Sequence, residues 1–114
     1  MPSATLEEYL EAIYKAGEHG EVRPGQLAEA LGVSAPTVTA TLGRLQTRGL
    51  IERPSGGVAL TTTGRQAALD IIRRHRLAER FLVDALGLSW DEVHAEASLL
   101  EHALSPLVQD ALAP

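Results

Sequence analysis

The pattern of apolar and polar positions predicts a mainly α-helical protein that begins with an amphipathic helix over residues 4–18. Apolar side chains recur in this segment every three or four residues, at Leu6, Tyr9, Leu10, Ile13 and Tyr14. This spacing places them on one face of a helix. Gly20 lies just beyond the segment, where helices commonly end.

Two further helices are predicted around a short turn. The first is PGQLAEAL (24–31), which opens on a proline and stops at Gly32. The second is APTVTATLGRLQTR (35–48), which Ser34 can cap. The turn LGVS between them, with Gly32 at the bend, is typical of a helix-turn-helix.

A β-hairpin is predicted next. The strand-like runs LIER (50–53) and VALT (58–61) flank the glycine-rich turn PSGG (54–57). Three helices followed by a hairpin is the order of a winged helix-turn-helix. We therefore expect a winged helix-turn-helix DNA-binding domain over residues 1–62.

The remaining residues, 63–114, are predicted to form a helical region. A long helix is expected to reach about Leu86, a second to run from residue 90 to about Leu104, and a short third helix to start at Pro106. The fold class is thus mainly α, with the winged helix-turn-helix first and a helical domain after it.

Composition narrows the class of protein. The chain has 114 residues, of which 45% are hydrophobic and none is cysteine. This suits one domain, or a small domain with a helical appendage, that uses neither disulfides nor thiolate metal sites. No apolar run approaches the ~18 residues of a membrane span, and no signal-peptide pattern opens the chain. We therefore expect a cytoplasmic protein without a membrane partner.

The net charge of −5 is unevenly distributed. Residues 1–74 hold eight acidic and eight basic residues, whereas residues 75–114 hold seven acidic and two basic ones. The neutral part can meet phosphates, and the acidic part can hold a cation or simply remain solvated.

The helix over residues 35–48 is expected to enter the major groove of double-stranded DNA with its N-terminal half leading. The candidate contacts are Ser34, Ala35, Pro36, Thr37, Thr39, Ala40, Arg44 and Arg48, together with Arg53 in the hairpin. No early side chain offers a bidentate base contact, so specificity is expected to depend on DNA shape and on paired half-sites. The alternative is that Thr37 and Thr39 merely face solvent and that Arg44 is a solvated helix charge, which the neutral charge of this part favours.

Two ionisable residues interrupt an apolar face of the long helix. His75 and Glu79 are four residues apart, among Ala68, Ile72, Leu82 and Leu86 at helical spacing. A buried imidazole and carboxylate must be paired or must coordinate something. A plain His–Glu pair in a helical interface and a metal site are both consistent with the spacing.

A second group of possible ligands lies in HAEASLLEH (94–102). If this stretch is helical, His94, Ser98, Glu101 and His102 form one stripe beside an apolar stripe of Val93, Ala97, Leu100 and Leu104. Nitrogen and oxygen donors without sulfur suit Mn(II), Fe(II), Co(II), Ni(II) or Zn(II). Glu8 and Glu11, taken alone, are ordinary surface acids, and Glu11 can pair with Lys15.

The chain resembles the diphtheria toxin repressor family of metal-activated regulators, which includes the manganese transport regulators. The resemblance is carried by EEYLEAIY (7–14), LAEALGVSAPTVTATLGRLQTRGLIE (27–52), LTTTGRQAAL (60–69), RRHRLAERFLVDALGL (73–88) and VHAEASLLEH (93–102). The combination of RHRLAERFL with the later VHAEASLLEH is more specific than the helix-turn-helix alone.

The resemblance implies a homodimer in which the helices after the hairpin form the interface and hold two metal positions. By motif position, His75, Glu79 and His94 match one ligand set, and Glu8, Ser98, Glu101 and His102 match the other. Glu11 corresponds to a carboxylate ligand of the manganese-responsive members.

Two positions depart from the family pattern. Ser98 stands where iron-type members have Cys and manganese-type members have Glu, and Glu8 stands where they have Met and Asp. A serine hydroxyl is a weak ligand, so a carbonyl or water would have to complete the second set. Oxygen in place of sulfur favours a harder ion, and we expect Mn(II) rather than Fe(II).

The function that follows is a metal-activated DNA-binding regulator of metal-ion homeostasis, expected to be a repressor. In it, Mn(II) or Fe(II) orders a homodimer for a pseudo-palindromic operator. The nearest alternative is a metal-independent winged-helix regulator whose His and Glu residues form interface pairs. A protein-interaction winged helix and a metal-dependent hydrolase are further alternatives. No nucleophile motif favours the hydrolase, so we do not expect an enzyme.

Overall fold

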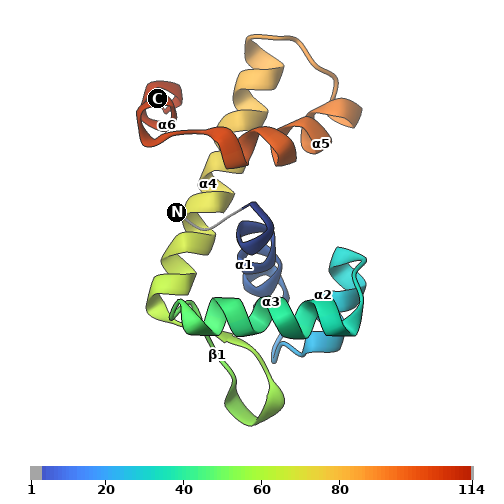
Figure 1. The fold of residues 1–114 in the computed structure, drawn as a ribbon. Coiled ribbons are helices and arrows are strands. Elements are labelled where there is room, and N and C mark those ends of the chain that lie inside the picture. The colour runs from blue at the N-terminus through green and yellow to red at the C-terminus, as the bar shows by residue number, and fades with distance from the viewer. Residues whose placement is uncertain (1–3, 114) are drawn as a thin grey trace. The chain divides into compact units, whose positions relative to one another are not determined.

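The computed structural model describes residues 4–113, and the chain divides into two compact units, Met1–Leu69 and Asp70–Pro114. The elements follow in the order α1 (Ala4–Gly17), α2 (Pro24–Leu31), α3 (Ala35–Thr47), β1 (Ile51–Glu52), β2 (Ala59–Leu60), α4 (Thr62–Asp84), α5 (Trp90–Leu100) and α6 (Pro106–Leu112), with short 3₁₀ turns η1 (Pro54–Gly56) and η2 (Glu101–Ala103) (Figure 1). The mainly helical fold expected from the sequence is confirmed.

The first unit is the winged helix-turn-helix. Leucines of all three helices form its core together with Ile13 and Val38, and none of these side chains is more than 2% exposed: Leu6, Leu10, Leu27, Leu42 and Leu45. In the hairpin, Ile51 pairs with Leu60 and Glu52 with Ala59 in an antiparallel register. An isolated bridge between Val22 and Val58, which the sequence analysis did not predict, ties the hairpin to the segment before α2.

The turn between α2 and α3 forms as predicted. Gly32 caps α2 with φ 66 and ψ 35, a left-handed conformation that side chains other than glycine adopt at a cost. Ser34 then caps α3, because its hydroxyl accepts a hydrogen bond from the backbone N–H of Thr37 at 3.3 Å. These two caps set the length of the turn and therefore the start of α3.

Helix α4 begins tightly against the hairpin. The hydroxyl of Thr61 donates to the carbonyl oxygen of Gly49 at 2.7 Å and accepts from the N–H of Gly64 at 3.0 Å. The predicted domain boundary falls where this helix starts, whereas the division between the two compact units falls after Leu69, within the same helix. The helix ends at Asp84 rather than near Leu86, because Gly87 (φ 68) closes the C-terminal turn and leaves Leu86 59% exposed.

The second unit packs the end of α4 against α5 and the segment that follows it. Its core contains Ala78, Leu82, Val93, Ala97 and Leu104, and Leu100 is partly buried against them. The apolar stripe predicted for α5 is therefore confirmed.

The helix over residues 90–104 is shorter than predicted. Helix α5 ends at Leu100, and Glu101–Ala103 form the 3₁₀ turn η2. Ser105 adopts the extended conformation favoured before a proline and caps α6, so the chain leaves the helix before Pro106. Glu101 and His102 consequently lie on a turn and do not continue the helical stripe of His94 and Ser98.

We expect Gly64→Ala to lower the free energy of unfolding by about 1–3 kcal/mol or more, because a Cβ atom there would overlap the backbone carbonyl of Leu50. The matched control is Gly43→Ala in α3, where a Cβ meets nothing within 4 Å and should stabilise the helix by about 0.5–1 kcal/mol. Urea unfolding followed by circular dichroism measures both. Equal effects of the two substitutions would contradict the close packing of α4 on the hairpin.

Candidate metal centre

Three predicted ligands meet in the second unit. His75 and Glu79 lie one turn apart on α4, and His94 lies in the first half of α5. The Nε2 atom of His75 is 3.2 Å from Nδ1 of His94 and 3.5 Å from Oε1 of Glu79. The Nδ1 atom of His94 is also 3.9 Å from Oε2 of Glu79. The structure thus brings together one ligand atom from each residue.

These separations suit a divalent cation. Two atoms that are each about 2.1 Å from one ion lie roughly 3–4 Å apart, which is the range of the three distances. The donors are two imidazole nitrogens and a carboxylate, a set that transition metals accept. The three residues therefore fit a metal ion without rearrangement of α4 or α5.

His75 is the buried member of this set. Its side chain is 11% exposed, whereas that of His94 is 71% exposed. The two rings meet edge to face, with centroids 4.8 Å apart. His94 is thus accessible to an incoming ion, while His75 is held in place by the packing around it.

The second predicted set is brought together in part. Glu101 and His102 lie on η2, with Oε1 of Glu101 3.9 Å from Nε2 of His102. The same Oε1 atom is 3.5 Å from Nδ1 of His75. His75 therefore faces the first set with one nitrogen and Glu101 with the other. The hydroxyl of Ser98 donates to the carbonyl oxygen of His94 at 3.0 Å, so its proton is used within α5.

Glu8 and Glu11 lie on α1, in the first unit. Glu8 is exposed. Glu11 pairs with Lys15 at 2.8 Å, as predicted, but its side chain is only 14% exposed and so is not an ordinary surface acid. A single salt bridge between residues four apart on a helix contributes little to stability.

The sequence analysis missed three polar residues beside the centre. Arg74 and Gln109 are 3% and 5% exposed, and Asp70 contacts both of them. Arg74 lies three residues after buried Ile71 and four before buried Ala78. A charged residue on that apolar stripe was the signal that could have found it.

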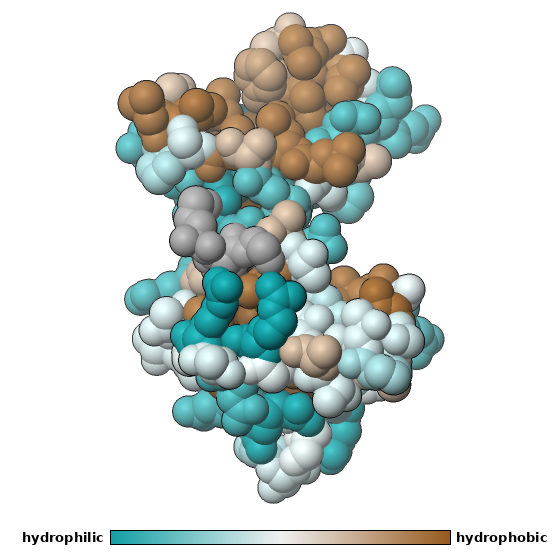
Figure 2. All heavy atoms as spheres, viewed as in Figure 1, coloured by the Kyte–Doolittle hydropathy of each residue, from teal (hydrophilic) through white to brown (hydrophobic). Residues whose placement is uncertain are grey.

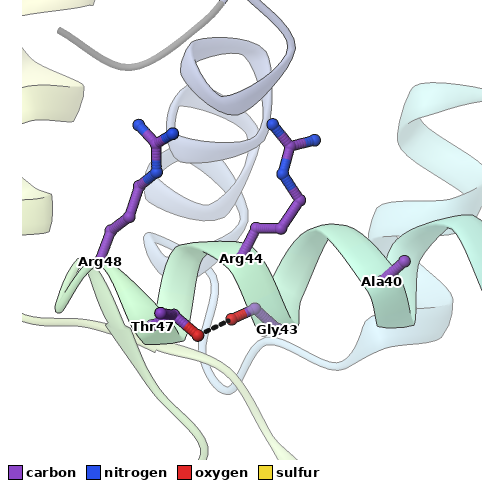
Figure 3. A pocket seen from close by; sticks show the side chains of 5 residues that line it. All are labelled: Ala40, Gly43, Arg44, Thr47 and Arg48. Carbon is purple, nitrogen blue, oxygen red and sulfur yellow. Dashed lines mark hydrogen bonds between the residues drawn. The ribbon is translucent and has the colours of Figure 1, made fainter.

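Most candidate DNA contacts lie on the surface of the first unit. The exposed ones are Ser34, Ala35, Pro36, Thr37, Thr39, Ala40, Arg44 and Arg48. Figure 3 shows that Arg44 and Arg48 extend side by side from one side of α3, above a shallow hollow lined also by Ala40, Gly43 and Thr47. This end of α3 therefore presents two exposed guanidinium groups on the same side of the helix.

Three of the candidate contacts, Ser34, Thr37 and Arg53, also have structural roles. The hydroxyls of Ser34 and Thr37 are 2.8 Å apart at the start of α3. The guanidinium of Arg53 donates to the carbonyl oxygens of Gly57 at 2.7 Å and Gly56 at 3.3 Å, and so holds the hairpin turn. Ser55 in that turn has φ 47, a left-handed conformation.

The second unit exposes a large apolar surface. Figure 2 shows apolar residues, in brown, over α5, α6 and the end of α4. The exposed large apolar side chains of this unit are Phe81, Leu86, Trp90, Leu99, Leu107 and Val108. The most exposed of these residues are Trp90 and Leu107, each of which is 80% exposed. Large exposed apolar patches are typical of interaction sites. Among residues 4–113 no helix is long and apolar enough to cross a membrane.

Two consecutive segments of the chain match the two domains of one protein family. Residues 1–58 match the N-terminal DNA-binding domain of the iron-dependent repressors, and residues 61–114 match their metal-binding and dimerisation domain. Together the matches cover nearly the whole chain.

Individual relatives agree. The chain is 47% identical over 112 residues to the iron-dependent repressor IdeR of Mycobacterium leprae, which covers 95% of this chain and 48% of that protein. It is 42% identical over 111 residues to the diphtheria toxin repressor of Corynebacterium diphtheriae, covering 95% of this chain and 49% of the relative. The chain thus spans about half the length of these relatives.

A solved structure of a manganese-dependent transcriptional repressor in complex with manganese has the same fold. It superimposes with a TM-score of 0.85 at 45% identity, over 94% of this chain and 50% of that chain.

We expect His75 and His94 to differ in their effect on the metal-free protein. His75→Ala should lower the free energy of unfolding by about 1–3 kcal/mol, because it removes buried polar contacts and leaves Glu101 without the imidazole. His94→Ala should change it by less than about 0.5 kcal/mol, because its side chain is mostly solvated. Urea unfolding with a chelator present measures both. A large loss from His94→Ala would assign that residue a structural role.

Proposed function

The chain belongs to the iron-dependent repressor family, and from this premise we propose that it is a metal-activated, DNA-binding transcriptional repressor that acts as a homodimer. The observation that carries the proposal is the meeting of His75, Glu79 and His94 in a helical unit that follows a helix-turn-helix. The regulated genes are proposed to concern metal-ion homeostasis.

Each residue of the first ligand set has a defined part. His75 offers Nε2 from a buried ring, Glu79 offers a carboxylate from the next turn of α4, and His94 offers Nδ1 from α5. When bound, a divalent cation supplies positive charge that offsets the carboxylates and a coordination sphere shared by two helices. A ligand favours the DNA-binding conformation only by its greater affinity for it.

A second ligand set is proposed around η2. Glu101 and His102 supply a carboxylate and an imidazole, and the buried position of Glu101 favours a role beyond solvation, because a buried carboxylate needs a compensating charge or hydrogen bonds. Ser98, Glu8 and Glu11 are proposed as ligands only because they match ligand positions in the family's sequence pattern.

The proposed metal is Mn(II) in preference to Fe(II). The chain has no cysteine, and its one methionine is Met1, so no sulfur donor is available among the predicted ligands. Oxygen and nitrogen donors suit the harder ion. One relative is named an iron-dependent repressor and one similar structure holds manganese, so the family includes both kinds.

DNA binding is proposed to use the exposed face of α3. Its N-terminal hydroxyls and methyl groups would meet phosphates and thymine methyls, and Arg44 and Arg48 would meet the backbone. Weak direct readout makes a pseudo-palindromic operator necessary, since two half-sites bound by a dimer add specificity. The exposed apolar surface of the second unit, which includes Trp90, Leu99 and Leu107, is the proposed dimer interface.

One observation favours the metal-independent alternative. His75 lies within 3.5 Å of both Glu79 and Glu101, and such pairs can satisfy a buried imidazole without an ion. Metal binding therefore has to be measured directly.

Metal should stabilise the protein. In a thermal melt, Mn(II) at 100 times its dissociation constant should add about 2.7 kcal/mol to the free energy of unfolding, with Mg(II) giving little. Glu79→Gln/His94→Asn and Glu101→Gln/His102→Asn should each lose part of the shift. If neither Mn(II), Fe(II), Co(II) nor Zn(II) raises the melting temperature, the histidines are interface pairs and the metal-independent regulator is the better account.

Arg44 and Arg48 should contribute to DNA affinity through phosphates. Arg44→Gln or Arg48→Gln is expected to lower the slope of log K against log salt concentration by about one each, for a random-sequence duplex with Mn(II) present. Fluorescence anisotropy measures the slope. Arg73→Gln, an exposed arginine of α4, is the control and should leave the slope unchanged. Unchanged slopes in all three variants would place the DNA contact elsewhere.

A further inference from the structure

A buried arginine connects α4 to the turn that carries two proposed ligands. The side chain of Arg74 is 3% exposed, and its Nη1 donates to the backbone carbonyl oxygen of Glu101 at 3.4 Å. Glu101 is the first residue of η2 and follows the last residue of α5. The carbonyl groups at a helix end lack partners within the helix, so a cation that donates to one of them stabilises the end.

The next residue of α4 contacts the same glutamate by its side chain. Nδ1 of His75 is 3.5 Å from Oε1 of Glu101, while Arg74 contacts its carbonyl oxygen. Two consecutive residues of one helix therefore contact both the carboxylate and the backbone of Glu101. Its side chain is only 3% exposed, so few other orientations are open to it.

Arg74 is in turn connected to α6. Its Nε lies 3.3 Å from Oδ2 of Asp70, one turn earlier in α4, and Oδ1 of Asp70 accepts from Nε2 of Gln109 at 3.0 Å. Gln109 is buried on the inner side of α6, whereas Leu107 and Val108 face outwards. The chain of contacts thus runs from α6 through Gln109, Asp70 and Arg74 to Glu101.

Stability alone is a poor reason for this arrangement. Removing a guanidinium from water is costly, and apolar residues of similar volume often replace buried ion pairs without loss of stability. What such a group does provide is a fixed direction for the carbonyl that it contacts. Partners that orient metal ligands typically change metal affinity by about 10–100-fold when they are removed.

We propose that Arg74 is a positioning residue, which sets the orientation of the turn that presents Glu101 and His102, and that Asp70 and Gln109 make this orientation depend on the seating of α6. The inference rests on the proposed function, since it takes Glu101 and His102 as ligands. It adds that an element without a predicted ligand, α6, regulates the second ligand set and leaves the first set unaffected.

The first part of the experiment needs no metal. Amide hydrogen exchange of residues 101–103 is measured by NMR in the metal-free protein for Arg74→Met, Arg74→Lys, Gln109→Leu and the exposed control Arg73→Met. Arg74→Met should raise exchange about tenfold, as expected for the loss of a charge-assisted hydrogen bond to the turn. Gln109→Leu should raise it less, and Arg73→Met should not change it. Arg74→Lys should raise exchange less than Arg74→Met does, because an ammonium keeps the positive charge but not the planar donor geometry of a guanidinium.

The second part measures Co(II) binding by absorption spectroscopy in two backgrounds. Glu79→Gln/His94→Asn leaves the Glu101 and His102 set, and Arg74→Met should weaken binding there about tenfold or more. Glu101→Gln/His102→Asn leaves the first set, and Arg74→Met should change binding there less than about threefold. Near-native far-UV circular dichroism of each variant, and unchanged exchange in the core of α5, exclude global unfolding as the cause.

The outcomes separate the two proposals. If Co(II) and Mn(II) do not bind the unsubstituted protein, the proposed function fails, and with it the ligand role that Arg74 is said to support. If they bind but Arg74→Met weakens both backgrounds equally or neither, the proposed function stands and the positioning role is overturned. Unchanged exchange at residues 101–103 overturns it as well, whatever the metal result.

Discussion

The contacts made by the imidazole of His75 are those on which the rest of the centre depends. Its Nε2 atom lies 3.2 Å from His94, and its Nδ1 atom lies 3.5 Å from Glu101, so one ring connects two donor sets. A neutral imidazole carries one proton, so whichever partner accepts it fixes the role of the other nitrogen. The ring is 11% exposed, so the packing around it holds it between the two sets. One side chain of α4 thus contacts both α5 and η2.

The second unit uses charge inside its core rather than around it. Arg74, His75 and Glu101 are all buried, although the neighbouring core residues Ala78, Val93 and Ala97 are small and aliphatic. Groups of this kind are tolerated only where their partners are held in place. The helices that carry these groups are held together by apolar packing. This packing stabilises the unit, and the polar contacts set the orientation of the groups that they join. A ligand that bridges α4 and α5 then acts on an arrangement that is already largely preorganised.

The two units differ in charge and in the kinds of side chain that they carry. Residues 1–74 carry equal numbers of acidic and basic residues, and two of the exposed arginines, Arg44 and Arg48, lie on or at the end of α3. The acidic remainder holds the His and Glu clusters and the exposed apolar surface. In the proposed function, phosphates would meet the neutral part of the chain and a cation the acidic part, which keeps most carboxylates away from like-charged phosphates.

Local signals in the sequence were sufficient for the helices, for the turn between α2 and α3, for the hairpin, and for the pairing of His75 with Glu79, because each depends on residues a few positions apart. Contacts over longer separations were decided by the tertiary structure. His75 meets His94 across 19 positions, Arg74 meets Glu101 across 27, and Gln109 meets Asp70 across 39. The break of α5 at Leu100 belongs with these, since it turns Glu101 out of the predicted stripe and into the core. Periodicity fixes which face of a helix a residue occupies, but only packing decides what that face meets.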